Sequence, residues 1–211
     1  DRLDWLCELT SADIAQLAEA AQRVADVDVE AITRDAFPLR TLALRLEGVQ
    51  DSLEHGTGAT LIRGFPAAEF SEDQATRMFW GMLQHLGTPV SQSATGERIF
   101  HVRDEGYRLD DPRARGPNTR KRLSFHTDRC DVIAFMCLRQ AKSGGENCWV
   151  SSAALFLEMQ KRRPELAKQL MQPYYYKRHN VDLGNDQPFC RQPIFSFCKG
   201  HFAASYLRVL I

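Results

Sequence analysis

Apolar residues recur at helical spacing through the first part of the chain. They return every three or four positions in three separate runs, as they do on the buried face of an amphipathic helix. Thr10 and Ser71 are residue types that start helices well, and Gly56 is suited to end one. The pattern predicts three helices, one opening at Thr10, one from Thr41 to about His55, and one from Ser71 to Gly87.

The spacing changes after the third helix. Apolar and polar residues now form short strand-like runs separated by Gly, Pro, Asn or Asp. These runs cover residues 98–103, 122–127, 132–139, 173–179, 193–198 and 202–211. Two short helices interrupt them, one capped by Ser151 or Ser152 and running to Lys161, and one from Pro164 through Met171.

The order of these elements predicts the architecture. Helices come first and strands after, which is typical of an α+β fold with helices packed against a mainly β core. We expect a single domain over residues 1–211, with a helical part at about 10–87 and a β core at about 98–211. The segment 104–122 is rich in Pro, Gly and charged residues, so we expect it to form a mobile lid loop.

Composition and charge exclude several classes of function. The chain has 211 residues, of which 44% are hydrophobic and 26% charged, so it can bury a core. It carries 27 basic and 27 acidic residues, and this balance argues against general binding to nucleic acid or to acidic membranes. No apolar run is long enough to span a membrane, and no signal peptide opens the chain. We therefore expect a soluble, cytoplasmic protein.

The six cysteines lack the spacing of a zinc ribbon or finger. Cys130, Cys137 and Cys148 lie among apolar residues, where a free cysteine usually behaves as a small hydrophobic side chain. We expect reduced, structural thiols, as is usual in the cytoplasm.

The strongest local chemical signal is the run Leu123–Asp128, which reads LSFHTD. In a strand, His126 and Asp128 project to the same face, and Arg122 and Ser124 share that face. An imidazole and a carboxylate side by side form either a hydrogen-bonded pair at a strand end or two corners of a metal site. Iron(II) oxygenases use such donors in a facial triad of two histidines and one carboxylate, which leaves positions open for co-substrate and oxygen.

Several further motifs occur in an order that resembles the TauD/TfdA family of iron(II)- and 2-oxoglutarate-dependent dioxygenases. The γ-butyrobetaine-hydroxylase-like and asparagine-hydroxylase-like branches look most similar. The resemblance extends from about residue 10 to the end. Besides Phe125–Asp128, it rests on the segments 57–66 (TGATLIRGFP), 86–89 (LGTP), 144–147 (GGEN) and 193–196 (PIFS), and on the segment around Tyr206.

This resemblance implies a double-stranded β-helix, or jelly-roll, core braced by helices. It implies that His126 and Asp128 are two ligands of Fe(II), and that Asn147 lies near the 2-oxoglutarate carboxylate, although a polar residue there could equally serve only the turn. The implied activity couples 2-oxoglutarate decarboxylation to hydroxylation or a related oxidation of a C–H bond. Halogenating relatives have a small residue in place of the carboxylate, so Asp128 favours hydroxylation.

The sequence departs from the family pattern in its later part. Relatives supply a third ligand from a distal His, followed by an Arg that grips 2-oxoglutarate with two hydrogen bonds. Neither is identifiable here. His179 is expected to be a surface or cavity residue and His201 a hairpin-turn residue. The chain ends at Ile211 inside an apolar run. We therefore expect the printed chain to stop before the last strands of the jelly roll.

Other polar residues have weaker assignments. Gln92, after the Pro89 turn, and His101, among alternating apolar residues, are candidates to contact substrate together with Arg122 and Ser124. His85 is expected to cap or pack the third helix. The expected partners are O2 and an amino-acid-like or carboxylate small molecule, and a homo-oligomer stays an open alternative.

Two rival functions stay open at this point. One is a catalytically inert family member that serves as a binding or assembly module, which a complete chain lacking the distal His and Arg would indicate. The other is a zinc-dependent hydrolase, which leaves the Gly144–Asn147 turn unexplained.

Overall fold

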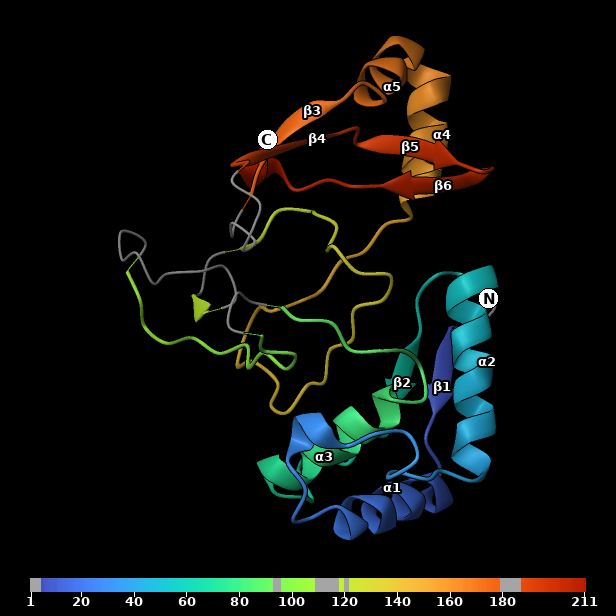
Figure 1. Cartoon of the computed structure of the whole chain (residues 1–211), viewed down its shortest axis with the longest axis vertical. Coiled ribbons are helices and arrows are strands. Elements are labelled where there is room, and N and C mark those ends of the chain that lie inside the picture. The colour runs from blue at the N-terminus through green and yellow to red at the C-terminus, as the bar shows by residue number, and fades with distance from the viewer. Residues whose placement is uncertain (1–4, 93–95, 109–117, 120–121, 179–186) are drawn as a thin grey trace. The chain divides into compact units, whose positions relative to one another are not determined.

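The computed structural model describes residues 5–92, 96–108, 118–119, 122–178 and 187–211 (Figure 1). The chain divides into two compact units. The first unit comprises Asp1–Ser91 and Ala134–Gly145, and the second comprises Gln92–Ile133 and Glu146–Ile211.

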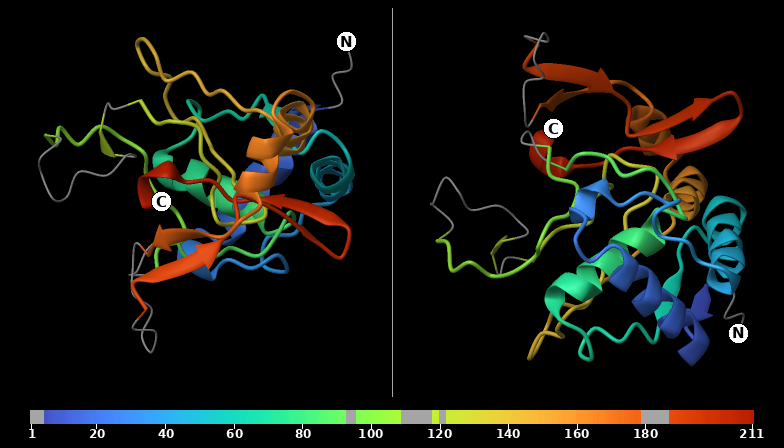
Figure 2. Two further views of the ribbon diagram at one scale, coloured as in Figure 1. Left: turned by 90° about the horizontal axis from the view of Figure 1, so that it is seen from above. Right: turned by 60° about the horizontal axis from the view of Figure 1, so that its bottom comes forward.

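The first unit is built from three helices and one pair of short parallel strands. The helices are α1 (Ser11–Arg23), α2 (Thr41–His55) and α3 (Glu72–Leu83), and a 3-10 turn, η1 (Val29–Ala31), follows α1. Strands β1 (Leu6–Glu8) and β2 (Leu61–Arg63) pair in parallel. Helices α1 and α3 lie side by side (Figure 2). The most deeply buried side chains of this unit are Leu17, Ile32, Phe37, Leu42, Leu46 and Met78.

Local caps explain where two of these helices start. The Thr10 hydroxyl accepts a hydrogen bond from the backbone of Asp13, whose carboxylate accepts one from the Thr10 backbone in return. Ser71 and Gln74 form the same reciprocal capping box at the start of α3. Each box satisfies backbone N–H groups that the first helical turn would leave unpaired. The predictions that helices open at Thr10 and Ser71 are therefore confirmed.

The end of α3 differs from the prediction. Its regular part stops at Leu83, and tighter turns continue the chain to Gly87, with the Leu86 N–H donating to the Leu83 carbonyl over 2.9 Å. His85 is buried in these turns, and its Nε2 donates to the Phe37 carbonyl over 2.9 Å. His85 is thus a packing residue at the end of this helix, as expected.

The second unit contains two helices and two antiparallel strand pairs. Helix α4 (Ser152–Arg162) is capped by Ser151, and α5 (Pro164–Leu170) follows after one residue. Strand β3 (Tyr174–Lys177) pairs with β4 (Phe189–Gln192), and β5 (Phe195–Cys198) pairs with β6 (His201–Ala204). A final 3-10 turn, η3, spans Arg208–Leu210.

Aromatic side chains form the core of the second unit, where α4 packs against the β5–β6 hairpin (Figure 1). The Phe156 ring lies 5.2 Å from the rings of Phe195 and Phe202, between ring centres. Ala167 and Ile194 complete the buried cluster, and Tyr206 packs against it. Edge-to-face and tilted rings at such distances add to the stabilisation that burial itself provides.

Three of the predicted strands are wrong. Residues 98–103, 122–127 and 132–139 do not form strands. In contrast, β3, β5 and β6 confirm much of the strands predicted at 173–179, 193–198 and 202–211. The physical reason is that a strand exists only where its N–H and C=O groups pair with a neighbouring strand, which alternation of side chains alone does not provide. Leu123, Phe125 and Phe135 are accordingly exposed.

The described residues combine helices with three two-stranded sheets, and these sheets do not close into a barrel. The mixed character of the predicted α+β fold is therefore confirmed, while the jelly-roll closure stays a prediction. None of the helices in this part of the chain is long and apolar enough to cross a membrane.

All six cysteines are free thiols, as expected. However, Cys130, Cys137 and Cys148 are exposed rather than packed. Cys137 lies in one of the segments that were predicted to be strands and Cys130 lies beside it, and this segment forms no strand that a neighbour would cover.

Candidate metal centre

His126 and Asp128 bring their side chains together in the second unit. The distance from His126 Nε2 to Asp128 Oδ1 is 3.8 Å. The His126 side chain is 30% exposed and that of Asp128 is 44% exposed, so both side chains are partly accessible from solvent. A distance of 3.8 Å is too long for a direct hydrogen bond. The pair is therefore not the simple hydrogen-bonded pair that the sequence left open.

A hydrogen bond to the backbone fixes the protonation pattern of the His126 ring. Its Nδ1 lies 2.8 Å from the Ser124 carbonyl oxygen. A carbonyl can only accept, so Nδ1 must carry the proton and donate it. In the neutral ring, Nε2 then has a free lone pair, and this is the nitrogen that faces Asp128. Metal-binding histidines are commonly oriented in this way through their second nitrogen.

Thr127 lies between the two donors and binds this segment to Tyr206, near the end of the chain. The Thr127 N–H donates to the Tyr206 carbonyl over 2.8 Å, and the Tyr206 N–H donates to the Thr127 hydroxyl, also over 2.8 Å. Sequence reasoning did not single out Thr127. The two residues are 79 positions apart, and no local pattern signals a pairing over that separation.

Two neighbours of the pair have shifted pKa values. Partial desolvation raises the pKa of the Cys130 thiol although the residue is exposed, and the carboxylates of Asp128 and Asp131 raise it further. Burial also raises the pKa of the Tyr176 phenol, against the opposing effect of the Arg129 guanidinium. Cys130 is thus kept as a neutral thiol beside the candidate ligands.

The donor pair fits a divalent metal ion. Bonds from a first-row divalent ion to a histidine nitrogen or a carboxylate oxygen are about 2.0–2.2 Å long, as in zinc sites. Two donors 3.8 Å apart can therefore reach one ion at the same time. Nitrogen and carboxylate donors together suit non-haem Fe(II). Within the described residues, no group of three or more His, Cys, Asp or Glu gathers around one point.

The other residues predicted to surround the site are placed as follows. Arg122 and Ser124 are exposed, and the contact of Ser124 with His126 is made by its backbone carbonyl. Asn147 is exposed and follows Gly144 and Gly145, whose φ angles of +76° and +81° explain why glycine occupies this turn.

Gln92 and His101 make contacts within their own loops. The Gln92 side-chain amide donates to the Arg98 carbonyl over 2.6 Å, and its backbone N–H donates to the Glu97 carbonyl. His101 is exposed, and its Nδ1 accepts from Arg103 over 3.2 Å. Both are therefore available at a surface.

Two further predictions are only partly covered by the described residues. His179 and most of the predicted lid at 104–122 lie outside them. At the described flanks of that segment, the Glu105 N–H donates to the Asn118 carbonyl over 3.1 Å, and Asn118 is buried. His201 is exposed at the start of β6, directly after the Lys199–Gly200 turn.

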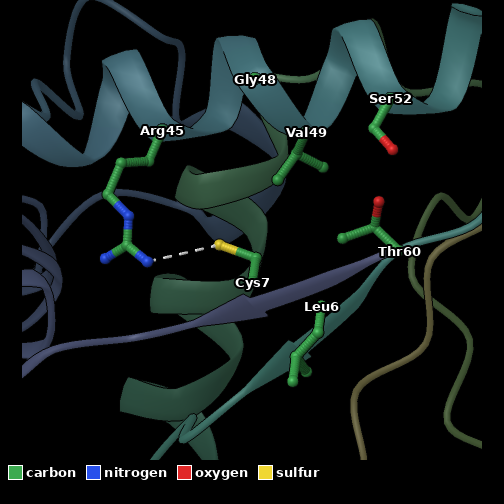
Figure 3. Close-up of a pocket in the computed structure, with 7 residues that line it drawn as sticks. All are labelled: Leu6, Cys7, Arg45, Gly48, Val49, Ser52 and Thr60. Atoms are coloured by element: carbon green, nitrogen blue, oxygen red, sulfur yellow. Dashed lines mark hydrogen bonds between the residues drawn. The ribbon is translucent and has the colours of Figure 1, made fainter. Parts of the chain in front are cut away.

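A cavity of about 260 Å³ lies in the first unit and contains none of the predicted site residues (Figure 3). It is lined by α2, by β1 and by Thr60, which directly precedes β2, with Arg45, Ser52, Cys7 and Thr60 presenting their polar groups. Arg45 also donates to Cys7 Sγ over 3.7 Å.

Comparison with known proteins establishes the class. Residues 19–208 match the family described as "Taurine catabolism dioxygenase TauD, TfdA family", and the chain belongs to this family. The expected family is thereby confirmed, whereas the two suggested branches stay untested.

The chain is similar to three curated proteins. The chain is 29% identical over 209 residues to FR-33289 synthase of Streptomyces rubellomurinus, covering 98% of the chain and 62% of that protein. It is 24% identical to a taurine hydroxylase-like protein of Stachybotrys chartarum, covering 82% of the chain and 47% of the relative. It is 26% identical to a clavaminate synthase-like protein of Arabidopsis thaliana, covering 64% of the chain and 40% of that relative. The chain thus spans less than two thirds of the length of these relatives.

Proposed function

We propose that the protein is a non-haem iron oxygenase that couples 2-oxoglutarate decarboxylation to hydroxylation, or a related oxidation, of a C–H bond in a small molecule. The observation that carries the proposal is the geometry of His126, whose Nδ1 is bound to a backbone carbonyl while Nε2 faces Asp128 across 3.8 Å. Membership of a dioxygenase family supports the same chemistry.

In this proposal, His126 and Asp128 hold Fe(II) through Nε2 and Oδ1. The ion and 2-oxoglutarate, when bound, supply the oxidising chemistry, and the protein supplies binding, orientation and exclusion of competing reactions. A distal His, not identified in this chain, is the third ligand. Because Asp128 keeps a carboxylate at its position, hydroxylation is favoured over halogenation.

Substrate and co-substrate are assigned to the polar residues near the motif. Asn147 donates its amide to the carboxylate of 2-oxoglutarate. Arg122 pairs with a carboxylate of the substrate, because a guanidinium offers two parallel donors. Ser124 and His101 contribute hydrogen bonds, and Gln92 shapes the loop that it closes onto Arg98.

The expected partners follow from the same proposal. An amino-acid-like or carboxylate substrate suits the balanced charge of the chain, with 27 basic and 27 acidic residues, and nucleic acid or a membrane does not. We place the protein in the cytoplasm, where its six free thiols would stay reduced. Homo-oligomer formation is compatible with this assignment.

The direct test uses the full-length protein and Fe(II) in the absence of oxygen. Addition of 2-oxoglutarate should produce a visible absorption band of the iron–2-oxoglutarate complex, and oxygen should then release succinate slowly even without substrate. His126→Ala should abolish both signals. His55→Ala, which changes an exposed histidine on α2, is the matched control and should change neither. Absence of the band and of succinate in the unaltered protein would favour the inert alternative.

A further inference from the structure

We propose that the Thr127 hydroxyl is a positioning group that sets the affinity of the His126–Asp128 pair for a divalent metal ion. The proposal rests on the function proposed above. Thr127 touches neither a metal ligand atom nor a substrate in this scheme. It acts through the backbone that carries both donors, by attaching that backbone to Tyr206.

Thr127 and Tyr206 are joined by two hydrogen bonds. In one of them a side-chain hydroxyl takes the place of the backbone carbonyl that a regular strand pair would use. The backbone N–H of Thr127 donates to the Tyr206 carbonyl, as in an antiparallel pair. The Tyr206 N–H, however, donates to the Thr127 hydroxyl over 2.8 Å. The hydroxyl oxygen also lies 3.5 Å from the Tyr206 carbonyl. A residue without a hydroxyl at position 127 would lose the second anchoring bond and leave the Tyr206 N–H without this acceptor.

The partner of Thr127 is firmly held. Its neighbour Ser205 donates its N–H to the Ile194 carbonyl over 2.8 Å, and the Ser205 carbonyl accepts from the Tyr176 hydroxyl over 2.7 Å. Gln192 donates to the Ser205 hydroxyl over 2.9 Å. The Tyr176 side chain is fully buried, and Tyr206 itself packs against the aromatic core. The segment at 205–206 is therefore tied to both strand pairs of the unit.

The donor pair, by contrast, has little packing of its own. Residues 122–128 form no strand, and Leu123 and Phe125 are more than half exposed, at 51% and 58%. Thr127 binds Tyr206 through its N–H and its hydroxyl, while the exposed side chains of His126 and Asp128 approach each other to 3.8 Å. Fixing the middle residue restricts both donors before a metal ion arrives, which lowers the entropic cost of binding it.

The size of the effect can be estimated from groups that orient metal ligands in other proteins. Loss of such a group commonly weakens metal binding by about 10–100-fold. Thr127 orients the backbone rather than a ligand atom, so we expect the lower end, about 10-fold. Thr127→Ser keeps the hydroxyl and should bind within about threefold of the unaltered protein, whereas the isosteric Thr127→Val should show the full loss.

The experiment is a Co(II) titration of the metal-free, full-length protein, followed by visible absorption, with thermal unfolding recorded for every variant. Thr127→Val should bind about 10-fold more weakly at unchanged folded fraction, and Thr127→Ser should restore binding. Thr76→Val is the matched control, because it removes a threonine hydroxyl that donates to a backbone carbonyl in α3, and it should bind Co(II) normally. His126→Ala should lose the signal.

Three results would overturn the proposal. One is equal binding by Thr127→Val and the unaltered protein, and another is equal weakening by the Ser and Val substitutions. The third is loss of the folded state in both Thr127→Val and Thr127→Ala, which would assign Thr127 to folding instead. If the unaltered protein binds no Co(II), or His126→Ala binds it equally well, the proposed function fails and this inference fails with it. That outcome is distinct, because it does not involve Thr127.

Discussion

At the scale of single residues, the two ring nitrogens of His126 have different neighbours. Nδ1 donates to the Ser124 carbonyl, and Nε2 faces Asp128 across 3.8 Å. Strand alternation in the HTD run predicts that the two donors share a face, although residues 122–127 form no strand in the structure. The role of the Ser124 backbone was not predictable, because it depends on the local path of the chain and not on the identity of residue 124.

A second residue-scale feature is the buried carboxylate of Asp13. It is 2% exposed, it accepts from the backbone N–H and the hydroxyl of Thr10, and it forms an ion pair with Arg45. Asp13→Ala would remove the carboxylate that pairs with Arg45 and half of the capping box, so we expect a loss of about 3 kcal/mol in the free energy of unfolding.

Urea unfolding checks this expectation. The control is Glu19→Ala, which removes an exposed ion pair with Arg23 on the same helix and should change stability by no more than about 0.5 kcal/mol. Equal effects of the two substitutions would show that the burial of Asp13 contributes nothing.

At the scale of elements, a glycine contact fixes the position of α3. A Cβ atom at Gly81 would overlap the Phe37 ring, whereas a Cβ atom at Gly48 in α2 would meet nothing within 4 Å. We expect Gly81→Ala to destabilise the fold by about 1–3 kcal/mol through overpacking. Gly48→Ala should instead stabilise it by up to about 1 kcal/mol, because alanine favours a helix more than glycine does. Thermal unfolding of the two variants should shift in opposite directions.

The bond from Tyr176 to the Ser205 carbonyl ties strand β3 to the segment after β6. Tyr176→Phe should cost about 1–2 kcal/mol at neutral pH, because the part-buried Ser205 carbonyl loses this donor. Burial raises the pKa of Tyr176, so the folded state holds its phenolic proton more tightly than the unfolded state does. Stability from the tyrosine is thus present below about pH 10 and is lost as the pH rises through the folded-state pKa.

Denaturant unfolding at a series of pH values measures this effect. The stability difference between the unaltered protein and Tyr176→Phe should be constant from pH 7 to about 9 and should shrink above about pH 10. A difference that grows with rising pH would have the wrong sign and would refute the assignment.

Elements also show where sequence reasoning succeeds and fails. Helices α1 and α3 were predictable because Thr10 with Asp13, and Ser71 with Gln74, encode their starts within four residues. The runs at 98–103, 122–127 and 132–139 have strand-like composition, but pairing depends on distant segments. The bond between Thr127 and Tyr206 illustrates this, since it joins residues 79 positions apart.

At the scale of the whole molecule, family membership and the local geometry support the same chemistry. The chain matches its family over residues 19–208 and divides into two compact units. The His126–Asp128 pair and the segment that anchors it lie within the second unit. Family motifs in the sequence predicted the class of enzyme and the two donors. Closure of a jelly roll and a third ligand depend on long-range pairing that these motifs do not encode.

The central claim is that His126 and Asp128 hold one divalent metal ion. The most direct measurement is a crystal structure of the full-length protein grown with Mn(II), with an anomalous difference map calculated from data collected near the manganese absorption edge. We predict one strong peak within bonding distance, about 2.2 Å, of both His126 Nε2 and Asp128 Oδ1. A map with no peak at this pair, or with manganese bound by other residues, would contradict the claim.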